Sequence, residues 1–346
     1  MSEVTNQEWE KLFAIMNGYV YTQTLTAACE LDLFTFLSNN PGASRDQIQA
    51  DLSLSAHSAR TLLLACCAVG LVERDDGTFG YRNSDIAAKT LVAGSRNCAT
   101  PFVLLTSKIM ERCGMHLTQC LRDERNTALD KEFPGDGATL YERLGQYPEM
   151  EQLFQDALGF YSSVNYSLDQ LSEFSQIHEL LDVGGGNGSN ASRLCKKFPD
   201  LRATVIELPQ GCDIGRRYVD EQGLSDRISF MAGDMFSDPF PGSCDGVLMA
   251  HLAEIFSEDT VAELYKKAFD YLPDKGKLII WSPAANDLET GGIEAAKLSL
   301  YFLSTASGEG TAWSFKVHEH LLKQSGFSDI SHYDGILEHT MIVATK

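Results

Sequence analysis

Residues 179–190 read Glu-Leu-Leu-Asp-Val-Gly-Gly-Gly-Asn-Gly-Ser-Asn, and this stretch decides the fold. Its apolar first half ends abruptly in a run of glycines at 184–188, and a segment compatible with a helix follows at 192–198. Glycine has no Cβ, so it suits positions where a backbone turns tightly or a ligand approaches closely. The start of a helix then offers unpaired N–H groups. The stretch therefore predicts a strand, a glycine-rich turn and a helix, with a ligand beside the turn.

Three further apolar runs, at 203–206, 228–230 and 246–249, also end in polar or glycine residues. Glu207 ends the first of them, and a carboxylate there can accept hydrogen bonds from both hydroxyls of a ribose. The carboxyl ends of parallel strands meet at one edge of a sheet, so these residues should line a single crevice. The pattern predicts an α/β fold.

These motifs resemble those of the class I S-adenosylmethionine (SAM)-dependent methyltransferases. The resemblance is greatest to small-molecule O-methyltransferases of the caffeate and acetylserotonin type, and it spans nearly the whole chain. The matching segments are 16–18, 27–34, 112–117, 125–126, 181–188, 206–209, 233–236 and 325–327. The resemblance implies a Rossmann-like class I methyltransferase sheet with helices on both faces. It also implies an N-terminal, mainly helical winged-helix dimerisation domain, SAM as cofactor and a small aromatic acceptor.

By the same resemblance, the cofactor site is built from the ends of the first three predicted strands. Its residues are Asp182, Gly184, Gly186, Gly188, Glu207, Leu208, Asp234, Met235 and Phe236. The three glycines border the methionine part of SAM. Glu207 takes the place of the family's ribose-binding Asp, and Asp234 and Met235 contact adenine.

A dinucleotide-binding loop is the alternative interpretation of the glycine run. Such loops space their glycines as G-x-G-x-x-G, so that a helix N-terminus receives a pyrophosphate. The run 184–188 fits only G-x-G-x-G, and no Lys or Arg occurs between Glu179 and Ser192. SAM carries no phosphate and needs no such charge, so the loop favours SAM.

The catalytic pattern of the family is broken in this chain. The family's general base is a His after the fourth strand, in a Leu-His-Asp-Trp motif, and Glu254 stands at that position. His251 lies three positions earlier, and Glu309 matches a supporting Glu of the family. Burial in an apolar pocket would raise the pKa of Glu254 toward neutrality, and a nearby Glu309 would raise it further. Glu254, His251 and Glu309 are therefore the candidate catalytic residues.

Several alternatives remain open for this site. Glu254 could bind a substrate amine, which fits N- or C-methylation of an amine- or amino-acid-bearing aromatic, or it could be a solvated residue that opens the next helix. The chain could also be a SAM-binding protein of this fold that does not methylate. A metal held by His251, Glu254, His318 and His320 is disfavoured, because His-x-His on a helix directs the two rings to different faces. We expect no metal, and we expect His318 and His320 at the surface.

The domain boundaries follow from these patterns. Residues 1–105 are expected to form the winged-helix dimerisation domain, 106–175 a helical connection that lines the acceptor pocket, and 176–346 the SAM-binding catalytic domain. Amphipathic patterns at 5–37 exceed what a small domain needs for its own core and indicate a homodimer interface. The residues that we expect in the acceptor pocket are Met110, Phe160, Tyr161 and Tyr301.

A winged-helix arrangement also suggests a DNA-binding protein. It is predicted from helical patterns at 45–52 and 56–69, followed by a hairpin around Asp75-Asp76-Gly77. DNA binding needs basic side chains on the recognition helix, and the helix at 56–69 carries only Arg60. The formal net charge is −20, which repels a polyanion. These observations exclude nucleic acid as the expected partner.

The remaining composition indicates a cytoplasmic protein. No apolar run approaches the roughly 20 residues of a membrane span, and the N-terminal residues show neither a basic region nor an apolar signal core. The nine cysteines are scattered without a C-x-x-C pair, which is typical of reduced thiols.

Overall fold

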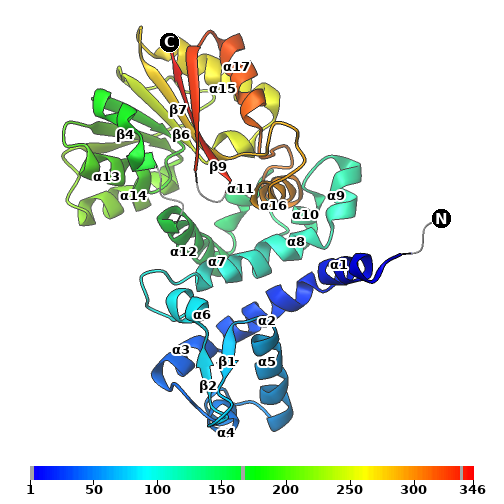
Figure 1. The fold of residues 1–346 in the computed structure, drawn as a ribbon. Helices are drawn as coiled ribbons and strands as arrows, with labels where there is room; N and C mark the ends of the chain where they lie inside the picture. The colour runs from blue at the N-terminus through cyan, green and yellow to red at the C-terminus, as the bar shows by residue number, and fades with distance from the viewer. Residues whose placement is uncertain (1–3, 165–167, 336–337) are drawn as a thin grey trace. The chain divides into compact units, whose positions relative to one another are not determined.

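The computed structural model describes residues 4–164, 168–335 and 338–346, and the chain divides into two compact units (Figure 1). One unit comprises Met1–Arg112 and Tyr147–Val164, and the other comprises Cys113–Gln146 and Asn165–Lys346. The segment 106–175, expected as a connection between domains, is thus shared by the two units. Among the described residues, no helix is long and apolar enough to cross a membrane.

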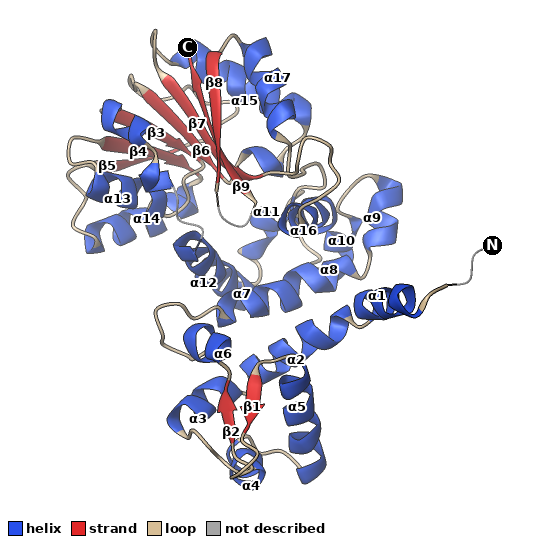
Figure 2. Cartoon of the chain, in the orientation of Figure 1, coloured by secondary structure: helices blue, strands red, loops and turns tan. Residues whose placement is uncertain are grey.

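The second unit contains a seven-stranded sheet in the order β5-β4-β3-β6-β7-β9-β8 (Figure 2). Its strands are β3 (Glu179–Val183), β4 (Arg202–Glu207), β5 (Ile228–Ala232), β6 (Gly246–Ala250), β7 (Lys277–Pro283), β8 (Ser328–Asp334) and β9 (His339–Thr345). Neighbours from β5 to β7 pair in parallel, whereas β9 is antiparallel to both β7 and β8. The four strands predicted from the apolar runs are confirmed as β3 to β6.

Helices cover both faces of this sheet (Figure 1). Helices α13 (Ser189–Lys197) and α14 (Pro209–Glu221) pack on one face, and α15 (Glu258–Tyr271) and α17 (Phe315–Ser325) pack on the other. Successive side chains of a strand point to opposite faces, so Leu248 and Met249 of β6 enter different cores. All five residues of β6 are buried, as expected for a central parallel strand. The predicted Rossmann-like architecture is confirmed.

Shorter helices complete the second unit. They are α9 (Leu117–Asp123), α10 (Thr127–Glu132), α11 (Leu140–Leu144), η2 (Leu168–Gln170), η3 (Ser172–Gln176), η4 (Ala253–Ile255), α16 (Ile293–Tyr301) and the π-helical turn η5 (Phe302–Ala306). The Asn126 side-chain amide joins two of the connecting segments by donating to the carbonyls of Ala138 and Ala306, at 3.0 and 3.1 Å.

The first unit is mainly helical and contains the expected winged-helix module. Its elements are α1 (Asn6–Met16), α2 (Gly18–Glu30), α3 (Leu33–Asn39), α4 (Arg45–Asp51), α5 (Ala56–Ala68), β1 (Val72–Arg74), β2 (Tyr81–Asn83), α6 (Asp85–Thr90), α7 (Thr100–Leu105), the π-helical turn η1 (Thr106–Glu111) and α12 (Pro148–Val164), with α8 (Arg112–Gly114) at its border. Ser44 begins α4 through a capping box with Gln47, and β1 and β2 form the antiparallel hairpin. Phe34, Ile48 and Leu63 lie in the buried core of this module.

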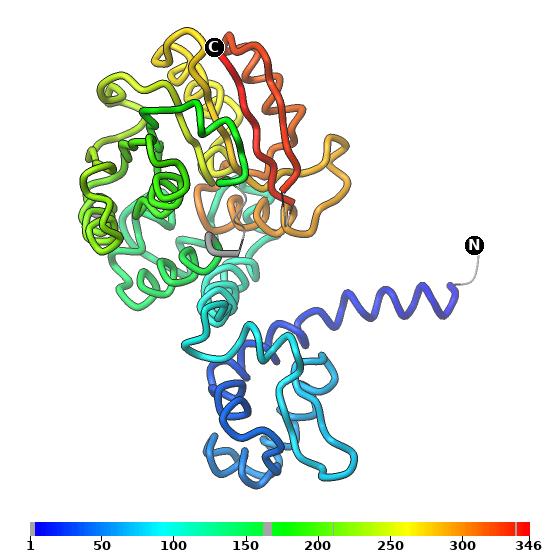
Figure 3. The backbone as a smooth tube through the Cα atoms, turned by 60° about the vertical axis from the view of Figure 1, so that its left-hand side comes forward, coloured from blue at the N-terminus to red at the C-terminus, as the bar shows by residue number. Residues whose placement is uncertain are grey.

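The first helix, α1, leaves its apolar side chains uncovered. No residue of α1 is buried, and Trp9, Phe13 and Met16 are 47%, 51% and 59% exposed. Figure 3 shows this helix, in dark blue, extending away from α3, α4 and α5 of the same unit. Such a contiguous apolar surface marks an interaction site.

Candidate active site

The glycine loop after β3 lies directly over a buried carboxylate. Asp182 is fully buried, and a Cβ on Gly185 would stand only 2.6 Å from the Asp182 carboxyl carbon, so only glycine fits there. Gly184, Gly186 and Gly188 all have positive φ, a conformation that side chains disfavour. The close approach of the loop to the carboxylate explains why glycines crowd this segment.

Asp182 is poised to bind a donor. Neither of its carboxylate oxygens accepts a hydrogen bond from any described residue. Burial, with a smaller contribution from the charge of Glu207, raises the pKa of Asp182 to about 7. A buried carboxylate without partners is destabilising, so a cationic or hydrogen-bonding ligand would relieve it.

Glu207, at the end of β4, forms a hydrogen bond with the same glycine loop. Its Oε2 accepts from the Gly186 N–H at 3.0 Å, and its Oε1 accepts from the Leu208 N–H at 2.7 Å. A carboxylate offers about four lone-pair positions, so two remain for hydroxyl donors. The side chain thus has the chemistry expected of a ribose-binding acid and also shapes the glycine loop.

Asp234, the acid after β5 that we expected to contact adenine, forms hydrogen bonds within its own turn. The Asp234 carboxylate accepts from the Phe236 N–H at 2.9 Å and from the Ser237 hydroxyl at 2.8 Å. These bonds, the first above all, lower the pKa of Asp234. Met235 packs partly buried against the core, and the half-exposed Phe236 ring meets Phe256 edge to face at 5.1 Å.

The end of β6 brings His251 and Glu254 together. The His251 N–H donates to the Trp281 carbonyl at 2.8 Å, and its φ of 53° turns the chain out of the strand. Glu254 lies in η4 and is 1% exposed. Its Oε1 is 3.1 Å from His251 Nδ1, and its Oε2 accepts from the Ser282 hydroxyl at 2.7 Å. The alternative that Glu254 is a solvated helix-opening residue is therefore wrong; α15 instead begins after Ser257, which caps it.

Glu254 also acts electrostatically on a buried group of polar side chains. Burial, together with the charge of Glu254, raises the pKa of Tyr265 and of Tyr141. The Tyr265 hydroxyl is 2.7 Å from His318 Nδ1, and burial lowers the pKa of His318 to about 4 despite the opposing effect of Glu254. His318 is therefore a buried neutral residue. The expectation of a surface position is wrong for it, whereas His320 is exposed.

Glu309 is not one of the residues whose side chains bind the Glu254 carboxylate. Its side chain is exposed, while both Glu254 oxygens are bound to His251 and Ser282. The segment around Glu309 instead approaches Glu254 through its backbone. A Cβ on Gly310 would stand 2.1 Å from the Glu254 carbonyl oxygen, so only glycine fits at position 310. Among the described hydrogen bonds and ion pairs, none joins the side chains of Glu309 and Glu254.

The four residues expected in the acceptor pocket fall into two groups. Phe160 and Tyr161 of α12 lie against Phe102 of α7, with ring centroids 6.2 and 5.1 Å apart, and the half-buried Met110 belongs to η1 of the same unit. Tyr301 ends α16 in the other unit and is buried. A hydrogen bond with Tyr301 opposes the effect of burial on the pKa of Tyr141.

Sequence reasoning missed Ser282 and the aromatic residues around His251. The His251 ring lies 4.7 Å from the Trp281 ring and 5.0 Å from the His339 ring. A signal for Ser282 was present, since it is a polar residue in the otherwise apolar run 278–283. His339 belongs to an antiparallel strand near the C-terminus, so its position beside His251 depends on sheet order alone.

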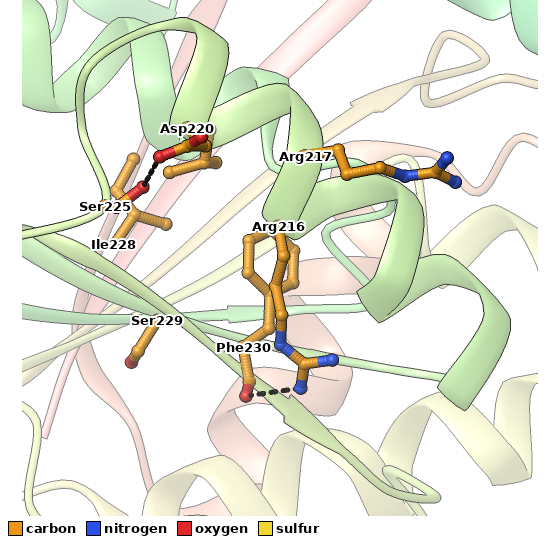
Figure 4. Close-up of a pocket in the computed structure, with 8 residues that line it drawn as sticks. Arg216, Arg217, Asp220, Ser225, Ile228, Ser229 and Phe230 are labelled. Carbon is orange, nitrogen blue, oxygen red and sulfur yellow. Dashed lines mark hydrogen bonds between the residues drawn. The ribbon is translucent and has the colours of Figure 1, made fainter.

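A hollow of about 550 Å³ elsewhere in the unit lies between α14 and β5 (Figure 4). Some of its polar groups are bound to one another: Arg216 donates to the Phe230 carbonyl at 3.3 Å, and Ser225 donates to Asp220 at 3.1 Å. None of the predicted site residues lines it. Across the described part of the chain, no three His, Cys, Asp or Glu side chains are grouped in a way that could hold a metal.

Sheet order, glycine loop and strand-end acids define a class I SAM-dependent methyltransferase. A family model for the O-methyltransferase domain matches residues 115–328, and one for the O-methyltransferase dimerisation domain matches 13–93. The chain belongs to this O-methyltransferase family, is an enzyme and uses SAM as its cofactor.

The similar proteins span nearly the same length. An L-tyrosine C(3)-methyltransferase of Streptomyces lavendulae is 32% identical, over 98% of this chain and 93% of the relative. A 3-hydroxy-5-methyl-1-naphthoate 3-O-methyltransferase of Streptomyces sahachiroi is 30% identical, over 84% and 81%. The crystal structure of the SAM-dependent methyltransferase SibL in its apo form superposes with a TM-score of 0.84 at 30% identity, over 97% of this chain and 98% of that one.

Proposed function

We propose that this methyltransferase acts on a small phenolic acceptor and transfers the methyl group to its oxygen. The observation that carries this proposal is the hydrogen-bonded set of His251, Glu254 and Ser282 at the end of β6. A phenol has a pKa near 10 and needs a base near neutral pH. The names of the two Streptomyces relatives give acceptors that both carry a hydroxyl on an aromatic ring.

We assign His251 as the general base and Glu254 as the residue that positions it. A carboxylate at Nδ1 holds one tautomer of the ring and stabilises its protonated form, so that Nε2 takes the phenol proton. Ser282 holds the second Glu254 oxygen and thereby fixes the carboxylate. General-base catalysis of this kind contributes about 10²–10⁴-fold to the rate. SAM, when bound, supplies the methyl carbon of its sulfonium.

The cofactor residues fit SAM by their chemistry. We propose that the unpartnered Asp182 carboxylate faces the ammonium of the methionine part and that Glu207 accepts from the ribose hydroxyls. Met235 then provides an apolar wall for adenine, while Asp234 holds the turn that presents it. Gly184, Gly186 and Gly188 let the backbone approach the ligand. Leu208 and Phe236, both exposed, would border the same site.

A second candidate, methylation of a ring carbon ortho to the hydroxyl, is favoured by the tyrosine C(3)-methyltransferase relative. Deprotonation by His251 serves both reactions, because the phenolate is nucleophilic at oxygen and at the ortho carbon. After methylation of carbon, the ring carbon loses its proton and the oxygen regains one, which restores the aromatic phenol. Incubation with methyl-labelled SAM and a panel of phenols, catechols, hydroxyindoles and arylamines, followed by mass spectrometry and NMR of the products, decides between them. Label on nitrogen alone would contradict both, and a protein that binds SAM but labels no acceptor would be a SAM-binding protein only.

We further propose a homodimer formed through the N-terminal unit. The match of residues 13–93 to a dimerisation domain and the uncovered apolar side of α1 support it. Light scattering should give twice the chain mass for the wild type, and Phe13→Asp should reduce it to one chain. A monomeric wild type would contradict the proposal. We also propose a cytoplasmic location, because the nine cysteines are scattered without a C-x-x-C pair, which is typical of reduced thiols; cell fractionation tests it.

A further inference from the structure

The turn 234–238, which follows β5, is held together by hydrogen bonds from its own side chains. The Asp234 carboxylate accepts from the Phe236 N–H and the Ser237 hydroxyl, and the Asp234 N–H donates to Asp238 Oδ2 at 2.8 Å. These bonds satisfy donors of the turn 234–238. Within the turn, the Asp234 carbonyl accepts from the Asp238 N–H at 2.9 Å. The carbonyls of Met235, Phe236 and Asp238 need donors from elsewhere.

Lys267 of α15 satisfies three of those carbonyls at once. Its Nζ donates to the carbonyls of Met235 at 2.7 Å, Phe236 at 3.1 Å and Asp238 at 2.6 Å. An ammonium has three N–H donors, so the whole donor capacity of Lys267 is spent on one turn. Its Nζ also lies 4.6 Å from the centre of the Phe240 ring, a favourable cation–π distance.

The position of Lys267 is fixed by the helix that carries it. Its neighbour Ala268 is buried in the core, as are Leu264 and Tyr265 one turn earlier, so α15 is packed against the core beside Lys267. Lys267 itself is half-buried. Burial lowers the pKa of its amine, and the carboxylates of Asp234 and Asp238 oppose that effect.

This arrangement bears on the cofactor because the same turn carries Asp234 and Met235. Lys267 binds three carbonyls of the turn, and carboxylates bind the N–H groups of Asp234 and Phe236, so these bonds hold the turn without a ligand. A binding surface that is already ordered avoids the entropy of ordering it on association.

We propose that Lys267 is a positioning residue for the adenine end of the cofactor site. It sets the affinity and base selectivity for SAM without touching SAM, by holding the turn 234–238 in its binding shape. This inference rests on the proposed placement of adenine beside Asp234 and Met235. The proposal gives α15 a functional role in addition to its packing against one face of the sheet.

The test is isothermal calorimetry of the full-length chain with S-adenosylhomocysteine and with its analogue carrying hypoxanthine in place of adenine. Lys267→Met keeps the aliphatic stem and removes the three donors. The matched control is Lys266→Met, because Lys266 is the preceding residue of the same helix and is exposed. Among the described hydrogen bonds and ion pairs it pairs only with Asp270 of that helix. Lys267→Arg keeps the charge, but its planar fork cannot aim three N–H groups at converging carbonyls.

We expect Lys267→Met to weaken adenosylhomocysteine binding by about tenfold and to reduce the preference for adenine over hypoxanthine. Lys267→Arg should show the same changes at about threefold, and Lys266→Met should match the wild type. Equal affinity and selectivity in the Lys267 variants and the control would overturn the proposal, as would an equal loss for both ligands, which indicates a purely structural role. If Lys267→Met does not fold, Lys267→Arg decides by the same criteria. A wild type that binds neither ligand would overturn the proposed cofactor site itself.

Discussion

Two buried carboxylates lie at the ends of neighbouring parallel strands, and their surroundings differ completely. Asp182 on β3 is fully buried and has no hydrogen-bond partner among the described residues. Glu254, just beyond β6, is 1% exposed and is bound on both oxygens, by His251 and Ser282. We propose that a ligand supplies the partner of the first carboxylate, whereas the protein itself supplies both partners of the second.

The difference separates the two tasks of the enzyme. At β3 the family's pattern is retained, because the loop geometry needs glycine at positions where other residue types do not fit. Beyond β6 the pattern is altered, and an acid–imidazole pair survives with its members at new positions. In the proposed mechanism, cofactor binding depends on backbone geometry, whereas proton transfer needs only two side chains within hydrogen-bond distance. Four substitutions test that separation.

The largest effect is expected from His251→Asn, which removes the assigned base. The rate of methyl transfer should fall by about 10³-fold, because the phenol proton loses its acceptor. The affinity for S-adenosylhomocysteine should stay within twofold, since His251 is outside the cofactor group. Steady-state kinetics and calorimetry give the two values. A rate within threefold of the wild type would remove His251 from the mechanism.

Glu254→Gln should lower the turnover number by about 10²-fold, because the amide can still orient the His251 ring but no longer stabilises its protonated form. Cofactor affinity should again be unchanged. Stopped assays at saturating SAM measure the effect, with Glu309→Gln as the control, since Glu309 is exposed. Equal losses in the two variants would contradict the assigned roles.

Asp182→Asn should weaken cofactor binding by about tenfold at pH 8 and abolish its pH dependence. Burial and Glu207 raise the pKa of Asp182 to about 7, and a ligand ammonium favours the ionised form. Wild-type affinity should therefore rise from pH 6 to pH 8, with proton release on binding below about pH 7. Calorimetry in buffers of different ionisation enthalpy measures that release. If the cofactor affinity of the wild type did not change with pH, the proposed contrast between Asp182, which binds the ligand, and Glu254, which does not, would be wrong.

The raised pKa of Asp182 affects the stability of the ligand-free protein in the opposite direction: stability falls, whereas cofactor affinity rises, as the pH increases. A carboxyl group whose pKa is raised by folding contributes stability below its unfolded value, near pH 4, and this contribution is lost as the pH rises through about 7. Asp182→Asn should then raise the melting temperature at pH 8 more than at pH 5. An equal shift at both pH values would contradict the assigned titration.

The smallest effect is expected from Ser282→Ala. It removes the bond to Glu254 Oε2 and leaves the bond of Oε1 to His251, so the turnover number should fall only about threefold. Ser304→Ala, which also removes a buried hydroxyl from the same unit, serves as the stability control. A loss as large as that of Glu254→Gln would show that Ser282 has a direct part in the reaction.

The fold was largely predictable because local sequence patterns carry it. The apolar run before Gly184 and the three runs that follow became β3 to β6, and the helix–helix–hairpin pattern at 45–82 became the winged-helix module. The division of residues 106–175 between two units was not predictable, since the return of α12 to the first unit depends on packing far along the chain.

The candidate site was predictable only where backbone geometry defines it. Glycine spacing and the acid at 207 are visible in a one-dimensional pattern. The bonds of Lys267 to the turn 234–238 and of Ser282 to Glu254 join residues 28 to 32 positions apart in sequence. Nothing in the local pattern marks such pairs.

The amino-acid sequence by itself determined the family, the cofactor and the strands that carry the site, because glycine turns and apolar periodicity act over a few residues. Only the tertiary structure decided what each buried acid does. A carboxylate's role depends on which donors the sheet order brings within about 3 Å, and β6, β7 and β9 come together from distant parts of the chain. Glu254, already close to His251 in sequence, therefore also binds Ser282 of β7, whereas no described residue binds the carboxylate of Asp182 on β3.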